Sequence, residues 1–293
     1  MFNPEHPKLS RNTLPIRDPE IISFVKKTDN NNFLFHALQN LELKDKFLNE
    51  YFSWLQTSKL NTLKGLEKFK NLSYVHGTSQ AFDAFYAENK NRRFRCFKGD
   101  FFYHALSWRN NYTSSFIDEE KLQSNDAVII SVPFSDNGHI HPDTEEVLET
   151  CNKLEIPVLI DLAYYNLARG IDFDLDEPCI STITFSLSKG FSLLDRLRIG
   201  IRCKRNFNDD PVDVFNSFDM FNKAGAAMGL EIIKNFSPDH NQNKFYEKQK
   251  DVCSKFKFEQ SNCVVFGLGD ENYSKFNRGS HWNRVCISNF LVE

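Results

Sequence analysis

The middle of the chain alternates short apolar runs with amphipathic stretches from about residue 72 onward. The runs are rich in β-branched residues and do not alternate apolar with polar positions, which is typical of strands buried on both faces of a parallel sheet. Helices at the amphipathic stretches, about 79–89 and 142–153, would cover those faces. The predicted strands are LSYVHG (72–77), FRCF (94–97), DAVIISVPF (126–134), IPVLID (156–161), STITFSLS (181–188) and LRIGIRC (197–203). This pattern predicts an α/β fold with a three-layer αβα domain around a mostly parallel sheet.

The two ends of the chain have a different pattern. Residues 1–15 contain three prolines and are expected to form an extended arm. Helical spacing follows at about 18–28 and 33–58, and it returns after the last predicted strand at about 210–236. The chain then ends in a mixed segment with a late strand at NRVCISNF (283–290).

A chain of 293 residues can bury one large core, or one large and one small core. We predict a large domain over 61–208. The segment 209–293, together with residues 1–60 that include the N-terminal arm, is predicted to form a reduced small α+β domain. The net charge of -3 gives no basic excess, so nucleic acid is not an expected partner.

The seven cysteines are scattered and lack a C-x-x-C spacing, which favours reduced thiols in the cytoplasm over disulfides or a zinc site. The N-terminus has no apolar segment of the kind found in signal peptides, and no run approaches membrane-spanning length.

Polar clusters follow four of the predicted strands, and ligands of open α/β sheets bind at the carboxyl ends of strands. The clusters are HGTSQ, SDNGH, DLAYY and SKG. Gly77, Thr78 and Ser79 join a strand to a helix, where small residues and free N–H groups can bind a phosphate. An ordinary helix cap would use the same residue types.

The later clusters contain side chains with reactive chemistry. Asp161 ends an apolar run, where it either meets a cationic partner or caps a turn, and Tyr164 could face the same crevice or pack in the core. Lys189 follows a strand directly, so it is either a desolvated nucleophile or a solvated loop residue. Arg198 could bind a phosphate through two of its N–H groups or lie at the surface.

The order of these motifs resembles the fold-type I pyridoxal 5′-phosphate enzymes, and within them the class I/II aminotransferases. The matching segments, in family order, are VHGTSQAFDAF for the phosphate turn, VIISVPFSDNG for the Asn-Pro-x-x-Gly turn, VLIDLAYY for the Asp-x-x-Tyr strand, SLSKGFSLLDRLRIG for the cofactor lysine and NRVCIS for the substrate-arginine strand. The resemblance covers about 75–203 and the terminal strand, whereas the first sixty residues match poorly.

The resemblance implies pyridoxal 5′-phosphate as the cofactor, held by Lys189 as a Schiff base. Lys189 would also move a proton between the substrate α-carbon and the cofactor, and Asp161 would pair with the pyridine nitrogen. Tyr164 would donate a hydrogen bond to the phenolic oxygen, and Arg284 would bind the substrate α-carboxylate. The residues implied around the phosphate are Gly77, Thr78, Ser79, Ser186 and Arg198.

Three details of the family pattern are ambiguous in this chain. Phe102 and Tyr103 both stand where the family places the aromatic residue that stacks on the ring. The turn SDNG leaves Ser135 or Asn137 to contact the phenolic oxygen in place of the usual asparagine. The loop before the phosphate arginine is longer than usual, so Arg196 is a rival ligand.

The implied activity is transfer of an amino group between an amino acid, or a related amine, and a keto acid. Its expected partners are thus a small-molecule amino donor and a keto acid acceptor. A decarboxylase, lyase or racemase would use the same cofactor residues, and a non-catalytic protein could retain the fold. A homodimer is also expected, because the family's active site lies at a subunit boundary.

Overall fold

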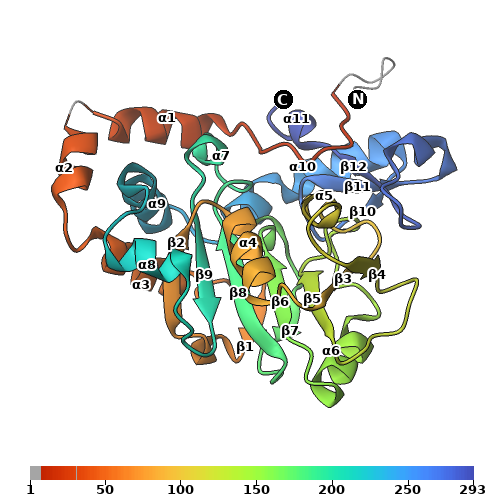
Figure 1. The fold of residues 1–293 in the computed structure, drawn as a ribbon. Helices are drawn as coiled ribbons and strands as arrows, with labels where there is room; N and C mark the ends of the chain where they lie inside the picture. Colours follow the sequence, from red (N-terminus) through yellow and green to blue (C-terminus); the bar gives the residue numbers. More distant parts are fainter. Residues whose placement is uncertain (1–7, 31) are drawn as a thin grey trace.

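The main sheet has seven strands in the order β2-β9-β8-β6-β5-β3-β4 (Figure 1). The computed structural model describes residues 8–30 and 32–293, so the first seven residues of the expected arm lie outside it. β9 is antiparallel to both of its neighbours, and the other pairs are parallel. The strands are β2 (Asn71–Val75), β3 (Arg93–Cys96), β4 (Ser114–Phe116), β5 (Asp126–Ser131), β6 (Val158–Leu162), β8 (Ile180–Ser186) and β9 (Gly200–Lys204). The predicted mostly parallel sheet is confirmed.

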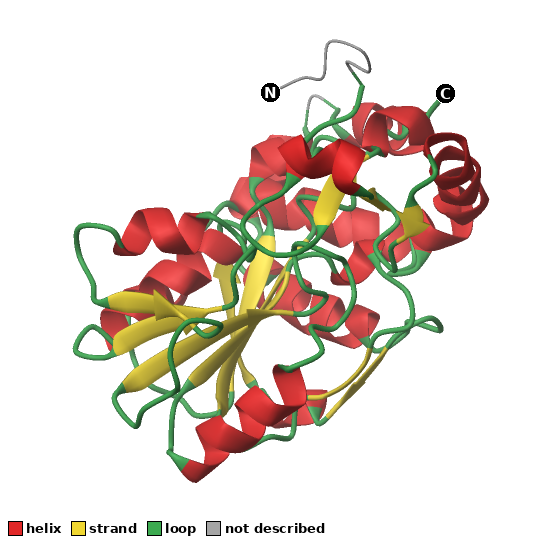
Figure 2. Ribbon diagram, turned by 90° about the vertical axis from the view of Figure 1, so that its right-hand side faces the viewer, coloured by secondary structure: helices red, strands yellow, loops and turns green. Residues whose placement is uncertain are grey.

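Helices cover both faces of this sheet, because alternate strand residues point to opposite sides. Ile129 and Leu159 share a core with α4 and α5, whereas Ile130 and Ile160 share one with α3, α6 and α9. Figure 2 shows the strands as a twisted fan with helices beside it. The helices of this part are α1 (Pro19–Thr28), α2 (Phe33–Gln39), α3 (Leu43–Leu55), α4 (Thr78–Glu88), α5 (Tyr103–Trp108), α6 (Thr144–Lys153), α7 (Leu194–Leu197), α8 (Pro211–Ser217) and α9 (Lys223–Asn235). The three-layer αβα architecture is therefore confirmed.

Two stretches expected as single long helices are each divided. The helix predicted at 33–58 consists of α2 and α3, and the one predicted at 210–236 consists of α8 and α9. The Asn40 carboxamide accepts the Glu42 N–H between the first pair, and Asn222 accepts the Gly225 N–H at the start of α9. Asparagine side chains compete in this way for backbone groups that a continuous helix would use.

A smaller part follows α9 and packs with the N-terminal arm. Its core includes Leu9 and Ile16 of the arm together with Phe245 and Val285, and Ser10 forms a bridge with Cys286. Its elements are α10 (His240–Phe256), β10 (Glu259–Gln260), β11 (Phe266–Gly269), η3 (Glu271–Phe276), β12 (Asn283–Cys286) and α11 (Ser288–Leu291). β10, β11 and β12 form an antiparallel sheet.

Domain boundaries at residues 60 and 208 stay a prediction. The core that contains the main sheet also contains Ile21 of α1, Phe47 of α3 and Met228 of α9. This packing groups 19–55 and 223–235 with the sheet. A second, two-stranded parallel sheet pairs β1 (Thr62–Lys64) with β7 (Asp172–Asp174), and short 3-10 turns lie at η1 (Leu66–Lys68) and η2 (Tyr165–Leu167).

A buried carboxylate fixes the end of the arm. Asp18 caps α1 by accepting the Glu20 N–H, and it also accepts hydrogen bonds from Lys244 and His240 of α10. Burial raises its pKa, but these hydrogen bonds prevail and lower the pKa to about 2. Although Asp18, Glu20 and His240 are close enough to hold a metal, Lys244 already binds both carboxylates. The cluster thus joins α1 to α10.

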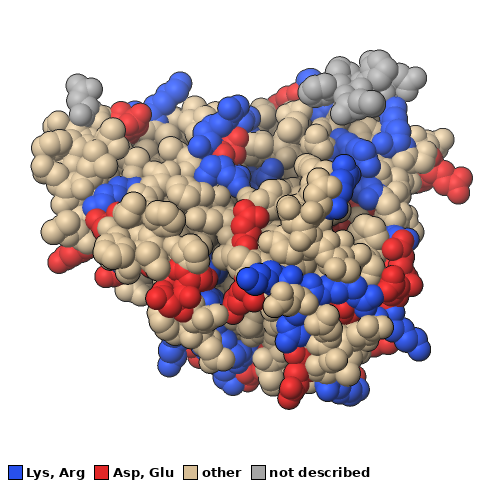
Figure 3. Space-filling view, viewed as in Figure 1, with Lys and Arg blue, Asp and Glu red and all other residues tan. Residues whose placement is uncertain are grey.

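The surface and the cysteines agree with an ordinary globular chain. Basic and acidic side chains are interspersed over the face in Figure 3, and neither sign dominates it. All seven cysteines are buried and unpaired. Among the described residues, no helix combines the length and apolar character needed to cross a membrane.

Candidate active site

The polar clusters predicted at the strand ends meet at one edge of the main sheet. β2 leads into Gly77 and α4, β6 carries Asp161 near its end, and β8 ends at Ser186, three residues before Lys189. Ser131 at the end of β5 is paired in register with Asp161. The carboxyl ends of parallel strands share an edge of the sheet, which explains why residues so distant in sequence gather there.

Lys189 is partly buried at this edge. Its Nζ donates a hydrogen bond to the Thr13 carbonyl at 3.1 Å. Burial lowers the pKa of the Lys189 amine, and the positive charges of Arg198 and Arg284 act in the same direction. A lowered pKa increases the fraction of neutral amine, which is the form that attacks carbonyl groups.

Asp161 is buried, with 5% of its surface exposed. It accepts the Ala163 N–H at 3.0 Å and a hydrogen bond from the Thr78 side chain. Burial, helped by the nearby Asp100 carboxylate, raises the pKa of Asp161 to about 8. A cationic group placed against this carboxyl would favour its ionised form, so the site is suited to a protonated ring nitrogen.

The turn after β2 approaches Arg198 closely. Gly77 has φ +74°, and a Cβ built on it would lie 2.7 Å from Nη2 of Arg198. The same nitrogen donates to the Ser79 hydroxyl at 2.9 Å, in the first turn of α4. Helix N–H groups and a guanidinium converge here, which is the donor set that phosphate prefers.

The serines after β8 complete this corner. The Ser186 hydroxyl donates to the Ile199 carbonyl and accepts the Ser188 N–H, both at 3.1 Å. The Ser188 hydroxyl is buried and has no partner among the described residues, so a ligand could use it. The rival Arg196 is 81% exposed beside Asp195, and it is therefore Arg198 that reaches the turn.

The aromatic candidates point in different directions. The Tyr103 hydroxyl donates to the Asp83 carboxylate on α4 at 2.9 Å, and Phe101 stacks on the Tyr103 ring. The Phe102 side chain is 57% exposed. Tyr103 is thus held against α4, the helix that follows the phosphate turn, whereas Phe102 is largely exposed. The structure adds Phe101 as a candidate that sequence reasoning missed.

The turn after β5 separates Ser135 from Asn137. The Ser135 hydroxyl donates to Asp100 at 3.1 Å, and its carbonyl accepts from Arg284 at 2.6 Å. Asn137 instead accepts the His139 N–H and, through its carbonyl, a hydrogen bond from Ser261. Ser135 therefore lies among the other candidate residues, and Asn137 serves the turn.

The N-terminal arm passes above the sheet (Figure 1) and contacts the candidate residues. Besides the bond from Lys189, the Thr13 hydroxyl shares a 2.8 Å hydrogen bond with Tyr164. The Arg11 carbonyl accepts from Arg284 at 2.6 Å. Sequence reasoning missed these contacts because backbone carbonyls have no residue signature.

Asp100 is a second residue that sequence reasoning missed. It is 6% exposed and accepts hydrogen bonds from Ser131, Ser135 and the Phe101 N–H. It lies in the GDFFYH segment, in which the family pattern singles out only an aromatic residue. The signal available was an acidic residue just after a predicted strand.

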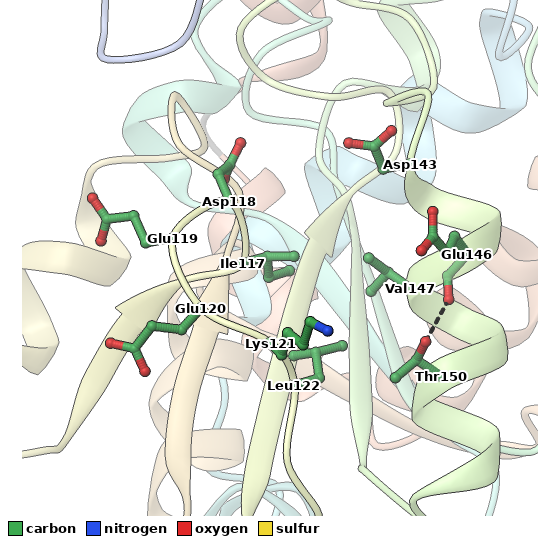
Figure 4. Close-up of a pocket in the computed structure, with 10 residues that line it drawn as sticks. All are labelled: Ile117, Asp118, Glu119, Glu120, Lys121, Leu122, Asp143, Glu146, Val147 and Thr150. Atoms are coloured by element: carbon green, nitrogen blue, oxygen red, sulfur yellow. Dashed lines mark hydrogen bonds between the residues drawn. The ribbon is translucent and has the colours of Figure 1, made fainter.

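A separate cavity of about 540 Å³ lies between α6 and residues 117–122 (Figure 4). Glu119 and Glu120 point outward there and pair with Lys98 and Arg93. None of the strand-end residues described above lines this cavity. Its acidic rim is thus a solvated surface, apart from the candidate site.

No protein-family model matches the chain, and no curated protein sequence matches it significantly. Solved structures do match. A pyridoxal-phosphate-bound structure from Clostridium difficile 630, assigned as an aminotransferase, has a TM-score of 0.68 at 14% identity, covering 94% of this chain and 86% of that one. An aminotransferase from Staphylococcus aureus has a TM-score of 0.62 at 12% identity, covering 94% and 88%.

A pyridoxal-phosphate-bound C-S lyase from Staphylococcus hominis, in complex with L-cycloserine, has a TM-score of 0.62 at 10% identity and covers 83% of this chain and 75% of that one. At such low identities the likeness concerns the fold. The chain therefore has the fold-type I architecture of these enzymes, as its motifs predicted.

Proposed function

We propose that this chain is a pyridoxal 5′-phosphate enzyme that attaches the cofactor at Lys189, and that it acts as an aminotransferase. The observation that carries the proposal is the meeting of a partly buried amine, a buried carboxyl and a phosphate-type turn at one sheet edge. The solved structures of this fold that bind the same cofactor support it.

The chemical groups of this cofactor each have suitable residues at the site. The start of α4 and Arg198 would hold the phosphate, and the unpartnered Ser188 hydroxyl is a further donor. Asp161 would face the ring nitrogen, because its buried carboxyl gains most from a cationic neighbour. When bound, the cofactor supplies an electron sink for carbanion chemistry at the substrate α-carbon.

Other residues would contact the ring or the substrate. Tyr164 and Ser135 would contact the phenolic oxygen, and Tyr103 or the neighbouring Phe101 would pack against the ring. Lys189 would take and return the substrate α-proton, since its lowered pKa suits a general base. Arg284 would bind the α-carboxylate in place of the carbonyl groups to which it now donates.

Transamination is tested by a half-reaction. Purified protein with pyridoxal phosphate should be yellow, and an amino donor alone should convert its spectrum to that of the amine form of the cofactor. A keto acid should then restore the first spectrum. Elimination of a sulfur substituent is the second candidate, favoured by the C-S lyase of the same fold; release of thiol from cysteine-type substrates without the spectral cycle would support it.

A non-catalytic protein that has retained the fold is the remaining alternative. Absence of any yellow species and of any adduct after borohydride reduction would establish that reading and overturn both enzyme proposals.

We place the enzyme in the cytoplasm, in line with its buried, unpaired cysteines.

The glycine of the phosphate turn gives a first prediction. Gly77→Ala should weaken cofactor binding by at least about 10-fold, because φ +74° disfavours alanine and the new methyl group would meet Arg198. Cofactor titration followed by absorbance measures the change. Gly170→Ala is a matched control, since it also has positive φ but its nearest contact is 3.6 Å; equal losses in both variants would argue against a phosphate turn at Gly77.

A homodimer is part of the proposal. Exposed apolar side chains lie on two neighbouring segments, which Lys223 and Lys44 join by hydrogen bonds to the Leu38 and Asn216 carbonyls. These side chains, the apolar patch, are Leu34, Phe35, Leu38, Leu41, Phe215, Phe218 and Met220. A second copy would remove them from water.

Phe218→Glu combined with Leu41→Glu should therefore convert dimers to monomers in light scattering. Lys153→Glu on the distant helix α6 is the control and should leave the mass unchanged. A wild-type protein that is monomeric at working concentration would contradict the dimer.

A further inference from the structure

We infer that Arg278 makes this site select amino donors whose side chain carries a second anionic group. The inference rests on the proposed function, in which Arg284 binds the α-carboxylate. Arg278 stands in the loop between η3 and β12, outside every motif identified in the sequence.

Arg278 lies beside the proposed carboxylate arginine. Its Nη1 donates to the Ser135 carbonyl at 3.2 Å, the same oxygen that accepts from Arg284 at 2.6 Å. The two donor nitrogens thus lie within roughly 6 Å of each other. A substrate whose α-carboxylate meets Arg284 would bring its side chain within reach of Arg278.

A cavity of about 390 Å³ opens at Arg278. The residues that line it include Arg11 of the arm, Asp100, Phe101 and Phe102. Asp100 bonds Ser131 and Ser135 at the strand ends, so the cavity adjoins the candidate site. Its size is within the range of small-molecule pockets and is ample for an amino acid side chain.

The charge around this cavity is incompletely balanced. The Arg278 side chain is 11% exposed, and its nearest carboxylate oxygen, on Asp136, is 3.8 Å away. Arg284, 1% exposed, has no carboxylate within ion-pair distance among the described residues. Arg278 and Arg284 both act on the single carboxylate of Asp136. Arg11 lines the cavity from an exposed position, where its guanidinium donates to the Asn277 carbonyl.

Arg278 also has donors to spare. Two of its five N–H groups bond the Ser135 and Asp100 carbonyls, at 3.2 and 3.0 Å, and these bonds orient the guanidinium. A carboxylate or phosphate on the substrate would use the remaining donors and supply the missing negative charge. A neutral amide of the same shape would leave the charge unbalanced.

The test compares isosteric donors in the half-reaction: aspartate against asparagine, and glutamate against glutamine. O-phosphoserine against serine shows whether phosphate serves as well as carboxylate. In the wild type, kcat/KM should favour the acids by about 10²-fold. Arg278→Met should lower kcat/KM for the acids by about that factor and leave the neutral donors little changed, whereas Arg278→Lys should recover part of the preference.

Two further measurements keep the test decisive if Arg278→Met folds poorly. Arg11→Met alters the same cavity from an exposed position and should reduce the acid preference without affecting the melting temperature. Calorimetry should show that succinate binds the cofactor-loaded wild type more tightly than butyrate does, and that Arg278→Lys narrows this difference.

The possible results distinguish failure of the role of Arg278 from failure of the proposed function. A yellow protein that uses acids and amides equally, or loses both equally in Arg278→Met, overturns the role of Arg278 and leaves the proposed function standing. A wild-type protein that binds no cofactor overturns the proposed function and this inference with it.

Discussion

Replacing Lys189 with alanine is expected to abolish covalent attachment of the cofactor and to lower turnover by about 10³-fold. We expect this loss because, in the proposed function, one amine both carries the cofactor and moves the substrate proton. The fold should persist, since the hydrogen bond that this amine donates to the Thr13 carbonyl can be replaced by water. Borohydride reduction followed by peptide mass spectrometry locates the adduct, and the half-reaction gives the rate.

Two variants separate the roles of this side chain. Lys189→Arg retains the positive charge but not the nucleophilic amine, so it should lose the adduct as completely as alanine does. Lys153→Ala removes a lysine that is 75% exposed on α6 and should keep both adduct and rate. An adduct that persists in Lys189→Ala would place the attachment at another lysine and contradict the proposal.

Six of the seven strands of the main sheet could be predicted from the sequence, whereas the three-residue edge strand β4 was not predicted. The six predicted strands are largely buried on both faces. Such strands read as continuous apolar runs, and the polar residue after each run marks the edge where ligands bind. Asp161, Lys189 and Gly77 could be singled out in this way. The assignment of each to a cofactor group required the order of the motifs, since every one of them has an ordinary structural use.

The features that the sequence did not reveal involve buried polar side chains and backbone carbonyl groups. Helix α10 buries Gln242 and Gln249, whose carboxamides donate to backbone carbonyls of neighbouring loops. Such buried polar residues interrupt the apolar periodicity that marks a helix in a sequence. Likewise, the arm contacts Lys189 and Arg284 through carbonyl oxygens, which every residue possesses. Arg278 is recognisable as a site residue only from its neighbours in space.

Replacing Asp161 with asparagine is expected to stabilise the cofactor-free protein at neutral pH while it weakens catalysis. The pKa of Asp161 is raised from 3.8 to about 8 in the folded state. The unfolded chain therefore ionises at lower pH than the folded one, and stability that is complete below about pH 4 is lost as the pH rises toward 8. At pH 7 this difference favours unfolding by on the order of 4 kcal/mol, which asparagine removes.

Thermal unfolding measured over a range of pH checks the direction of this change in stability. Without cofactor, Asp161→Asn should melt several degrees above the wild type at pH 7 and close to it at pH 4, where both side chains are neutral. With cofactor, the order should reverse or the gap should shrink, because a ring nitrogen facing Asp161 favours the carboxylate that asparagine lacks. Turnover should fall by about 10²-fold or more.

The pH dependence makes this result specific to the buried charge. A variant that gained stability equally at pH 4 and pH 7 would owe it to packing or hydrogen bonding, and the raised pKa would then play no part. A gain confined to neutral pH, lost when the cofactor binds, would show that the chain maintains an unfavourable carboxyl for the sake of a cationic ligand. A loss of stability of this kind makes sense only if the site binds a cationic ligand.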